Sequence, residues 1–405
     1  MDTSNTREYR IVALICVAEM LTMAAFASYA SFLPRLRIEW TMTAAQAGFI
    51  SGAFFFGYMV TVPVLSSLTD RTDARNVYLV ACCLNAAGVF AFAFLAQGMY
   101  SGAFFQAIAG IGLAGTYMPG LKVLTDRVEG PRQSRYISFY TASFGFGTTL
   151  SLLASGWVAK AYSWRTTMAL LALGPLLAAS IMYLAIDRQD PVKKPSGSLF
   201  SQFGDVWSLS EVRRYIYGYA AHCMEIFGVR SWLVAFFTFA FGASGAPVSP
   251  TEAAAIINLF GTPASILGNE AANRVGRKRW IVAMMLLSGT LCWTVGFTSS
   301  LAWWLIIGAV AIYFVTAMLD SASLTAGLIQ ATPQEFRGAA MAIYSFLGFG
   351  IGFIAPLVFG ATLDYSGGSD RALSWTLAFG ILGLCCLVWG VVNLRSEDRR
   401  QKTED

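Results

Sequence analysis

A few ionisable side chains lie inside long apolar stretches of this sequence, where such groups are rare. They are Glu19, His222, Glu225, Arg230 and Asp320. An ionisable group in the hydrocarbon core of a membrane costs several kcal/mol, so such residues mark proton or substrate sites by default. These residues are therefore the first candidates for functional groups.

His222 and Glu225 are three residues apart, which places them on one face of a helix. A histidine and a carboxylate in contact can exchange a proton, although the same contact can be a purely structural hydrogen bond. At about 1.5 Å per residue, Glu225 lies about 15 Å into its apolar stretch and Glu19 about 12 Å into its own. Glu19 is either a proton or substrate site or a polar contact between helices. Asp320 lies nearer one end of its stretch, where pairing with loop cations is the alternative.

Arg230 follows Glu225 by five residues, which is a rotation of about 140° around a helix. The two side chains are therefore expected to face different partners. An arginine at this depth can bind a carboxylate or another anion through two parallel hydrogen bonds. The alternative is a structural ion pair within the protein.

The composition indicates a membrane protein. Hydrophobic residues make up 56% of the chain and charged residues 13%, against about 25% charged in soluble domains. Apolar stretches of about 20 residues match a hydrocarbon core of about 30 Å. The first stretch is too long for a signal peptide and is expected to remain as a span. Twelve spans are predicted, near residues 11–33, 46–67, 77–97, 103–122, 137–158, 167–186, 215–241, 253–271, 280–299, 303–326, 339–362 and 373–393.

The sequence predicts an all-α membrane protein with twelve transmembrane helices in two pseudo-symmetric six-helix bundles. Residues 1–186 form the N-terminal half, 187–214 a cytosolic linker, and 215–405 the C-terminal half with a cytosolic tail. With both termini inside, the inner segments hold 22 Lys and Arg residues and the outer segments 5. This bias orients the chain with both termini in the cytoplasm of a bacterial inner membrane. The net charge of +5 is thus a topology signal that implies no nucleic-acid partner.

A short basic motif occurs once in each half. Residues 67–75 read SLTDRTDAR and residues 271–279 read AANRVGRKR, so that Arg71 and Arg274 are 203 residues apart. A glycine-rich stretch starting at Tyr140 recurs at Tyr344 with almost the same offset. Repeats at one offset indicate a duplicated helical bundle, which is common among secondary transporters.

With these motifs the chain resembles the major facilitator superfamily. Leu68, Asp70, Arg71 and Arg75 match the family motif between spans 2 and 3, and residues 274 and 276–278 match its second copy. The short sequence Ser163-Trp164-Arg165 also resembles a family loop. Two positions depart from the family. Gln106 stands where span 4 has an Arg, and span 5 lacks the proline of the antiporter motif.

The resemblance implies that spans 1, 4, 7 and 10 line a central cavity. These spans carry the candidate substrate or proton-coupling residues Glu19, Tyr117, His222, Glu225, Arg230 and Asp320. It also implies a cytosolic gating motif, a charge latch between access states, made of Asp70, Arg71, Arg75, Arg274 and Arg277. The alternative is that these charges only set the topology.

The predicted function is secondary active transport, specifically proton-coupled symport of a small organic anion or zwitterionic metabolite by alternating access. The alternative is a proton-driven efflux antiporter for cationic or amphipathic compounds, and a non-transporting sensor of the same fold is also possible. An enzyme is not expected, because the chain has one histidine and lacks hydrolase, zinc-protease and phosphate-loop motifs. Seven cysteines without ligand spacing predict no metal, no cofactor and no disulfides. The expected partners are the substrate, protons and the lipid bilayer, and the protein is expected to be a monomer.

Overall fold

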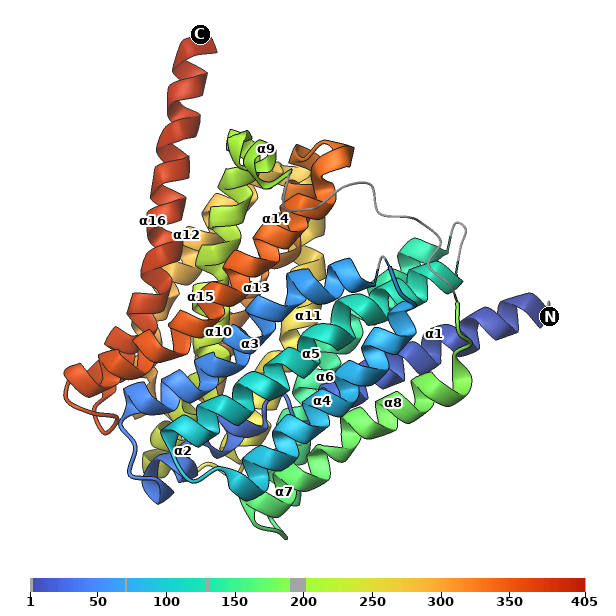
Figure 1. Cartoon of the computed structure of the whole chain (residues 1–405). Coiled ribbons are helices and arrows are strands. Elements are labelled where there is room, and N and C mark those ends of the chain that lie inside the picture. The colour runs from blue at the N-terminus through green and yellow to red at the C-terminus, as the bar shows by residue number, and fades with distance from the viewer. Residues whose placement is uncertain (1–2, 70, 129–131, 190–201, 405) are drawn as a thin grey trace. The chain divides into compact units, whose positions relative to one another are not determined.

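Helices account for the regular structure in a computed structural model that describes residues 3–69, 71–128, 132–189 and 202–404 (Figure 1). The helices of the first half of the sequence are α1 (Thr3–Thr22), α2 (Ser28–Glu39), α3 (Ala44–Leu68), α4 (Ala74–Leu95), α5 (Met99–Arg127), α6 (Gln133–Val158), α7 (Trp164–Leu171) and α8 (Leu173–Ala185). The remaining helices are α9 (Phe203–Ser208), α10 (Ser210–Ser244), α11 (Pro250–Val275), α12 (Arg277–Val295), η2 (Gly296–Ser300), α13 (Trp303–Met318), α14 (Ser321–Ala331), η3 (Gln334–Phe336), α15 (Arg337–Tyr365) and α16 (Ala372–Glu404).

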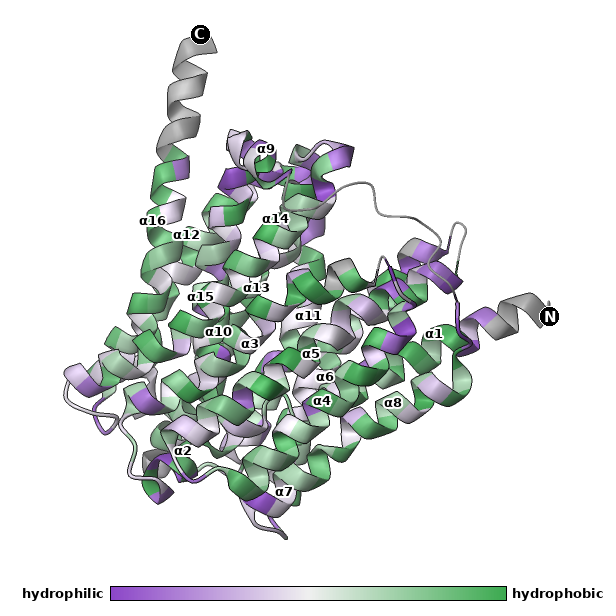
Figure 2. Ribbon diagram, viewed as in Figure 1, coloured by the Kyte–Doolittle hydropathy of each residue, from purple (hydrophilic) through white to green (hydrophobic). Residues whose placement is uncertain are grey.

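Each predicted span corresponds to one long helix or to consecutive helices. Spans 1, 6 and 10 are interrupted, as α1–α2, α7–α8 and α13–α14. Among the described residues, nine helical segments are long and apolar enough to cross a membrane. The other three predicted spans, at α1–α2, α6 and α11, are not among these nine. Figure 2 shows hydrophobic residues along the helices and hydrophilic residues gathered near helix ends and loops. The prediction of an all-α membrane protein is confirmed.

The chain forms two compact units. Unit 1 contains Met1–Phe32 and Ala53–Ser198, and unit 2 contains Leu33–Gly52 and Leu199–Asp405. Part of the predicted linker, residues 190–201, lies outside the described residues. The rest of that interval includes α9 and the first turn of α10.

Within unit 1, α4 and α5 pack closely along their lengths. Gly112 makes this approach possible, because a Cβ atom there would lie 2.2 Å from the backbone nitrogen of Asn85. The Asn85 side chain can then donate from Nδ2 to the carbonyl of Ala109 at 2.8 Å. Helix α1 packs against α8 and α6 in the same unit.

In unit 2, the first half of α3 packs on α15 although the two are far apart in the sequence. Asp364 accepts hydrogen bonds from the backbone N–H groups of Ala44 (2.9 Å) and Ala45 (2.8 Å). These first-turn N–H groups have no partner within their own helix, and a carboxylate there also interacts favourably with the helix dipole. A Cβ atom at Gly48 would lie 2.1 Å from the carbonyl oxygen of Pro356, so the contact requires glycine.

The interruption of span 1 is stabilised by one side chain. The turn over residues 23–27 separates α1 from α2, and Ser151 of α6 lies against it. The Ser151 hydroxyl accepts a hydrogen bond from the backbone N–H of Ala27 at 2.9 Å and donates to the carbonyl of Ala24 at 2.8 Å. It thereby satisfies two backbone groups that a continuous helix would have paired internally.

The other interruptions have comparable causes. Pro175 has no N–H group, so the carbonyl of Leu171 lacks its helical partner where α7 ends. Between α13 and α14, the carbonyl of Leu319 accepts from the Trp280 indole at 3.0 Å. The N–H of Ala322 donates to the Ser265 hydroxyl at 3.2 Å.

Ser151→Ala should destabilise the protein by about 1–3 kcal/mol, because it leaves a buried donor and a buried acceptor without partners. Thermal unfolding of the purified protein in detergent measures this. Ser180→Ala is the matched control, because the exposed Ser180 hydroxyl only donates to a carbonyl of its own helix. Equal melting temperatures for the two variants would contradict the role of Ser151.

Candidate functional sites

Glu19 lies in the core of unit 1 and is 0% exposed. Its Oε2 atom accepts a hydrogen bond from the Tyr140 hydroxyl at 2.9 Å, and the Thr22 hydroxyl lies 3.5 Å from the same atom. Its Oε1 atom is buried without a hydrogen-bond partner. No Lys, Arg or His side chain pairs with Glu19 among the residues that the structure describes. The carboxyl group therefore lies among hydroxyl groups, without a cation.

Tyr117 belongs to the same cluster. Its ring stacks on that of Tyr140 with centroids 5.6 Å apart, and Phe144 meets it edge-on at 5.4 Å. The Tyr140 hydroxyl also lies 2.9 Å from the carbonyl oxygen of Tyr117 and 3.3 Å from that of Thr116. The structure thus brings Glu19 of span 1 and Tyr117 of span 4 together through Tyr140, a residue that the sequence reasoning used only as part of a repeat.

In unit 2, His222 contacts Asp320 and not Glu225 as the three-residue spacing had suggested. The His222 Nδ1 atom lies 2.8 Å from Asp320 Oδ1, in a close contact that is not aligned as a hydrogen bond. His222 is 4% exposed and Asp320 1%. Asp320 occupies the junction between α13 and α14, which turns its carboxylate toward α10. The structure therefore pairs Asp320 with His222 and not with loop cations, which was the alternative.

Glu225 faces a different set of groups. Its Oε1 atom accepts from the Cys292 thiol at 3.3 Å, and its Oε2 atom accepts from Ser288 at 3.1 Å and from the Cys386 thiol at 3.2 Å. The donors come from α12 and α16, and Glu225 is 0% exposed. Both carboxylate oxygens are therefore occupied by neutral donors of the protein itself.

Arg230 has no carboxylate partner in the part of the chain that the structure describes. Its guanidinium carbon lies 5.9 Å from the centroid of the Phe314 ring, and its Nε atom is buried without a hydrogen-bond partner. A cation over an aromatic face gains some stabilisation, but five N–H donors need acceptors. Arg230 therefore lies in a different environment from Glu225.

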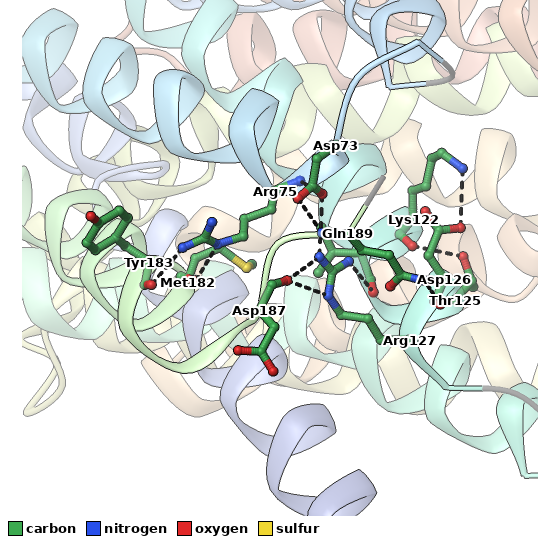
Figure 3. A network of polar contacts seen from close by, with 11 residues as sticks. Asp73, Arg75, Lys122, Thr125, Asp126, Arg127, Met182, Tyr183, Asp187 and Gln189 are labelled. Atoms are coloured by element: carbon green, nitrogen blue, oxygen red, sulfur yellow. Dashed lines mark hydrogen bonds and ion pairs between the residues drawn. The ribbon is translucent and has the colours of Figure 1, made fainter. Parts of the chain in front are cut away.

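Two residues of the first basic motif, Asp73 and Arg75, belong to a polar network of unit 1 (Figure 3). Asp73 caps the start of α4 by accepting from the backbone N–H of Arg75 at 3.0 Å. The same carboxylate pairs with Arg127 at 3.4 Å and accepts from the backbone N–H of Gln189 at 2.9 Å. The network therefore joins the start of α4 to the end of α5 and to the segment after α8.

Arg75 itself binds the end of α8. It donates to the carbonyl oxygens of Met182 at 3.2 Å and Tyr183 at 2.7 Å, and its guanidinium lies over the Tyr183 ring (Figure 3). A cation at the last carbonyls of a helix is favoured by the helix dipole. Arg75 therefore has a structural contact within its own unit.

Arg277 in the second motif behaves similarly. It donates to the side-chain oxygens of Asn269 at 2.7 Å and Asn273 at 2.6 Å, and to the carbonyl of Ser323 at 3.3 Å. All of these groups belong to unit 2. Arg71 and Arg274 are exposed, and Asp70 lies outside the described residues. The gating role of this motif stays a prediction.

Several polar residues in the interior or at helix ends were not predicted as site residues, although Gln106 stood out as a departure from the family motif. Asp364 stands at the end of span 11, where an acid looks like an ordinary loop charge. Asn85 and Gln106 are neutral, so a search for ionisable groups did not select them. Both are buried, at 3% and 7% exposure.

The fold and these interior polar clusters define a polytopic α-helical membrane protein. The sequence profile of the Major Facilitator Superfamily matches residues 15–269 and 248–405, nearly the whole chain. The chain therefore belongs to the major facilitator superfamily. The twelve-span, two-bundle prediction agrees with this family.

Similar solved structures support the fold. A bacterial homologue of the human lysosomal transporter Spinster, in an inward-facing and unoccupied conformation, matches with a TM-score of 0.75 and 14% identity, over 96% of this chain and 97% of that one. The POT family transporter PepTSo matches with a TM-score of 0.75 and 12% identity, over 98% and 99%. At these identities the likeness concerns the fold alone.

A relative from Agrobacterium vitis carries the name "Putative tartrate transporter". It is 23% identical over 184 residues, which are 45% of this chain and 41% of the relative. The matched stretch is thus less than half of either protein.

Asp73→Ala should destabilise unit 1 by about 1–3 kcal/mol, because it removes a helix cap and leaves the Arg127 guanidinium, 8% exposed, without its acid. Asp126→Ala is the control, because it breaks a more exposed i,i+4 pair with Lys122 and should cost under about 0.5 kcal/mol. Chemical or thermal unfolding in detergent compares the two. If Asp126→Ala were the more destabilising variant, the cap would not be the main contact of this network.

Proposed function

We propose that this transporter carries a small organic anion together with a proton. The observation that carries the proposal is the environment of Arg230, a guanidinium in the membrane-spanning helix α10 without an acidic partner among the described residues. A charge within a membrane span is costly without a counter-charge, so the site is suited to a substrate that brings the negative charge.

The nearby acids are already engaged. Asp320 contacts His222, and Glu225 accepts from Ser288 and two thiols. In the described part of the chain, neither Asp320 nor Glu225 forms an ion pair with Arg230. Its planar fork suits a carboxylate, which it can bind through two parallel hydrogen bonds. The similarity to a relative named as a tartrate transporter supports an organic acid as the substrate class.

Glu19 is the candidate carrier of the coupled proton. It is fully buried, its neighbours are hydroxyl groups, and no cation pairs with it in the described part of the chain. Burying an unpaired charge is costly, which favours the neutral carboxyl when the group is closed off from water. The group can therefore bind and release a proton as its access to water changes.

Uptake by purified protein in liposomes tests the proposal. We expect labelled tartrate or a similar small organic acid to accumulate when an inward proton gradient is imposed, and the accumulation to stop when the gradient is dissipated. Uptake that ignores the gradient would overturn the proton coupling. Proton-driven export of a lipophilic cation in the same liposomes, without anion uptake, would instead establish the efflux alternative.

Arg230→Ala should weaken binding of the anion by about 10- to 100-fold, because hydrogen bonds to charged groups contribute about 1.5–3 kcal/mol. Arg230→Lys keeps the charge but cannot reproduce the fork, so its affinity should be intermediate. Equilibrium binding to the purified variants measures both. Unchanged affinity in both variants would remove Arg230 from the substrate site.

Glu19→Gln should abolish accumulation against a gradient and preserve exchange of labelled for unlabelled substrate. The amide resembles a permanently protonated carboxyl, so the cycle can no longer release the proton. Glu225→Gln is the comparison, because three neutral donors surround that carboxyl; it should retain proton-driven uptake if its role is structural. The opposite result would transfer the proton role from Glu19 to Glu225.

We also propose that the protein lies in a bacterial inner membrane with both termini and residues 187–214 in the cytoplasm. The distribution of 22 inner against 5 outer Lys and Arg residues supports this orientation. Topology reporters fused after Gly197 and after Asp405 should both report a cytoplasmic location. An exported signal from either fusion would contradict the orientation.

A further inference from the structure

Beside the interruption of span 1, unit 1 contains a small cavity of about 10 Å³. Thr22, Ala25 and Ser28 border it from the interrupted span, Asn85 from α4 and Gln106 from α5. This volume is about that of one water-sized probe, which is the minimum that a buried water molecule needs. The cavity has polar groups on several sides, so it differs from an empty apolar void.

Two buried amides face this cavity with unused hydrogen-bonding capacity. Asn85 donates from Nδ2 to the carbonyl of Ala109, but its Oδ1 atom is buried and has no partner. Gln106 is 7% exposed, and no hydrogen bond holds its amide among the residues that the structure describes. Leaving buried polar groups unsatisfied costs about 1–3 kcal/mol each. A ligand that both donates and accepts hydrogen bonds would satisfy them.

Water fits this requirement better than a cation. The residues around the cavity include no carboxylate, whereas a water molecule can donate to Asn85 Oδ1 and also bond to the Gln106 amide. Buried waters typically make about three hydrogen bonds to otherwise unsatisfied groups. The Thr22 and Ser28 hydroxyl groups are further partners in the lining.

Thr22 links the cavity to Glu19. Thr22 borders the cavity, and its hydroxyl lies 3.5 Å from Glu19 Oε2 and donates to the Glu19 carbonyl at 2.8 Å. Rotation of the hydroxyl hydrogen is enough to direct it to the carboxylate. Thr22 is 1% exposed, so it forms the inner wall between a water-sized space and a buried acid.

The other titratable groups around Glu19 are phenols and thiols. They come from each helix packed against it: Cys16 on α1, Tyr58 on α3, Tyr78 and Cys82 on α4, Tyr117 on α5 and Tyr140 on α6. None of these groups is a base that would compete for a proton near neutral pH.

We propose that Asn85 and Gln106 hold one water molecule beside the interrupted span, and that Thr22 passes protons between this water and Glu19. An incoming proton reaches the water, the water gives a proton to the Thr22 oxygen, and the Thr22 hydroxyl proton moves to Glu19 Oε2. Water and threonine are restored, and the carboxylate becomes a carboxyl. The relay rests on the proposed proton coupling, whereas the water site does not.

A structure at a resolution that shows ordered water tests the site itself. We expect one water in the wild type, about 2.7–3.2 Å from Asn85 Oδ1 and from the Gln106 amide, and its loss in Gln106→Leu. An empty cavity, or a side chain in the place of the water, would overturn the proposal irrespective of transport.

Proton uptake by the reconstituted protein tests the relay. Thr22→Val removes the hydroxyl at nearly constant volume and should slow proton uptake by at least about ten-fold, while substrate exchange without a gradient continues. Thr22→Ser should restore the wild-type rate. Thr116→Val is the matched control, because Thr116 is equally buried and its hydroxyl also donates three residues back, but it does not border the cavity.

The outcomes distinguish a failure of the relay from a failure of the proton coupling on which it rests. Wild-type proton uptake in Thr22→Val, or equal losses in Thr22→Val and Thr116→Val, would overturn the relay. If the wild type transports its substrate without any proton movement, the proposed coupling fails and the relay fails with it. In that case only the structure that shows ordered water tests the water site.

Discussion

Within a hydrocarbon core, a polar group must find its partner in the protein or in a water molecule that the protein encloses. This constraint explains the interruptions of the spans. A helix can open at residues 23–27 only because Ser151 binds the two backbone groups that the opening releases. The opening between α13 and α14 depends in the same way on Trp280 and Ser265. The few interior side chains that remain unsatisfied are consequently the informative ones.

The sequence predicted the spans well because a run of about 20 apolar residues has few alternatives in a membrane protein. It also selected the buried ionisable residues, since each is conspicuous against its neighbours. It could not predict their partners. Glu225 and His222 share a helical face in the sequence pattern, but their contacts depend on small differences in direction around α10. As a result His222 contacts Asp320, whereas Glu225 accepts hydrogen bonds from α12 and α16.

The internal duplication also predicts which residues of the second half correspond to Glu19 and Tyr117. His222 follows Glu19 by 203 residues, and Asp320 follows Tyr117 by the same interval, which is also the offset of the basic motifs. The Glu19 cluster and the His222–Asp320 pair thus occupy equivalent places in the two halves. One half has a carboxyl beside phenols, and the other has an imidazole beside a carboxylate. Applying the offset to Glu19 would have indicated His222 as its counterpart.

The Tyr140 hydroxyl has a single hydrogen and three oxygen atoms within reach, on Glu19, Tyr117 and Thr116. When Glu19 is ionised, the Tyr140 hydroxyl donates its hydrogen bond to the carboxylate. When Glu19 is protonated, the carboxyl can itself donate to the phenol, and the phenolic hydrogen is released to a carbonyl of α5. The protonation state of Glu19 on α1 thereby changes the backbone hydrogen bonding of α5. The change lies beside Pro119, where the missing N–H already weakens the helix. The infrared band of the Tyr117 or Thr116 carbonyl would consequently report the protonation of Glu19, although neither carbonyl is bonded to Glu19.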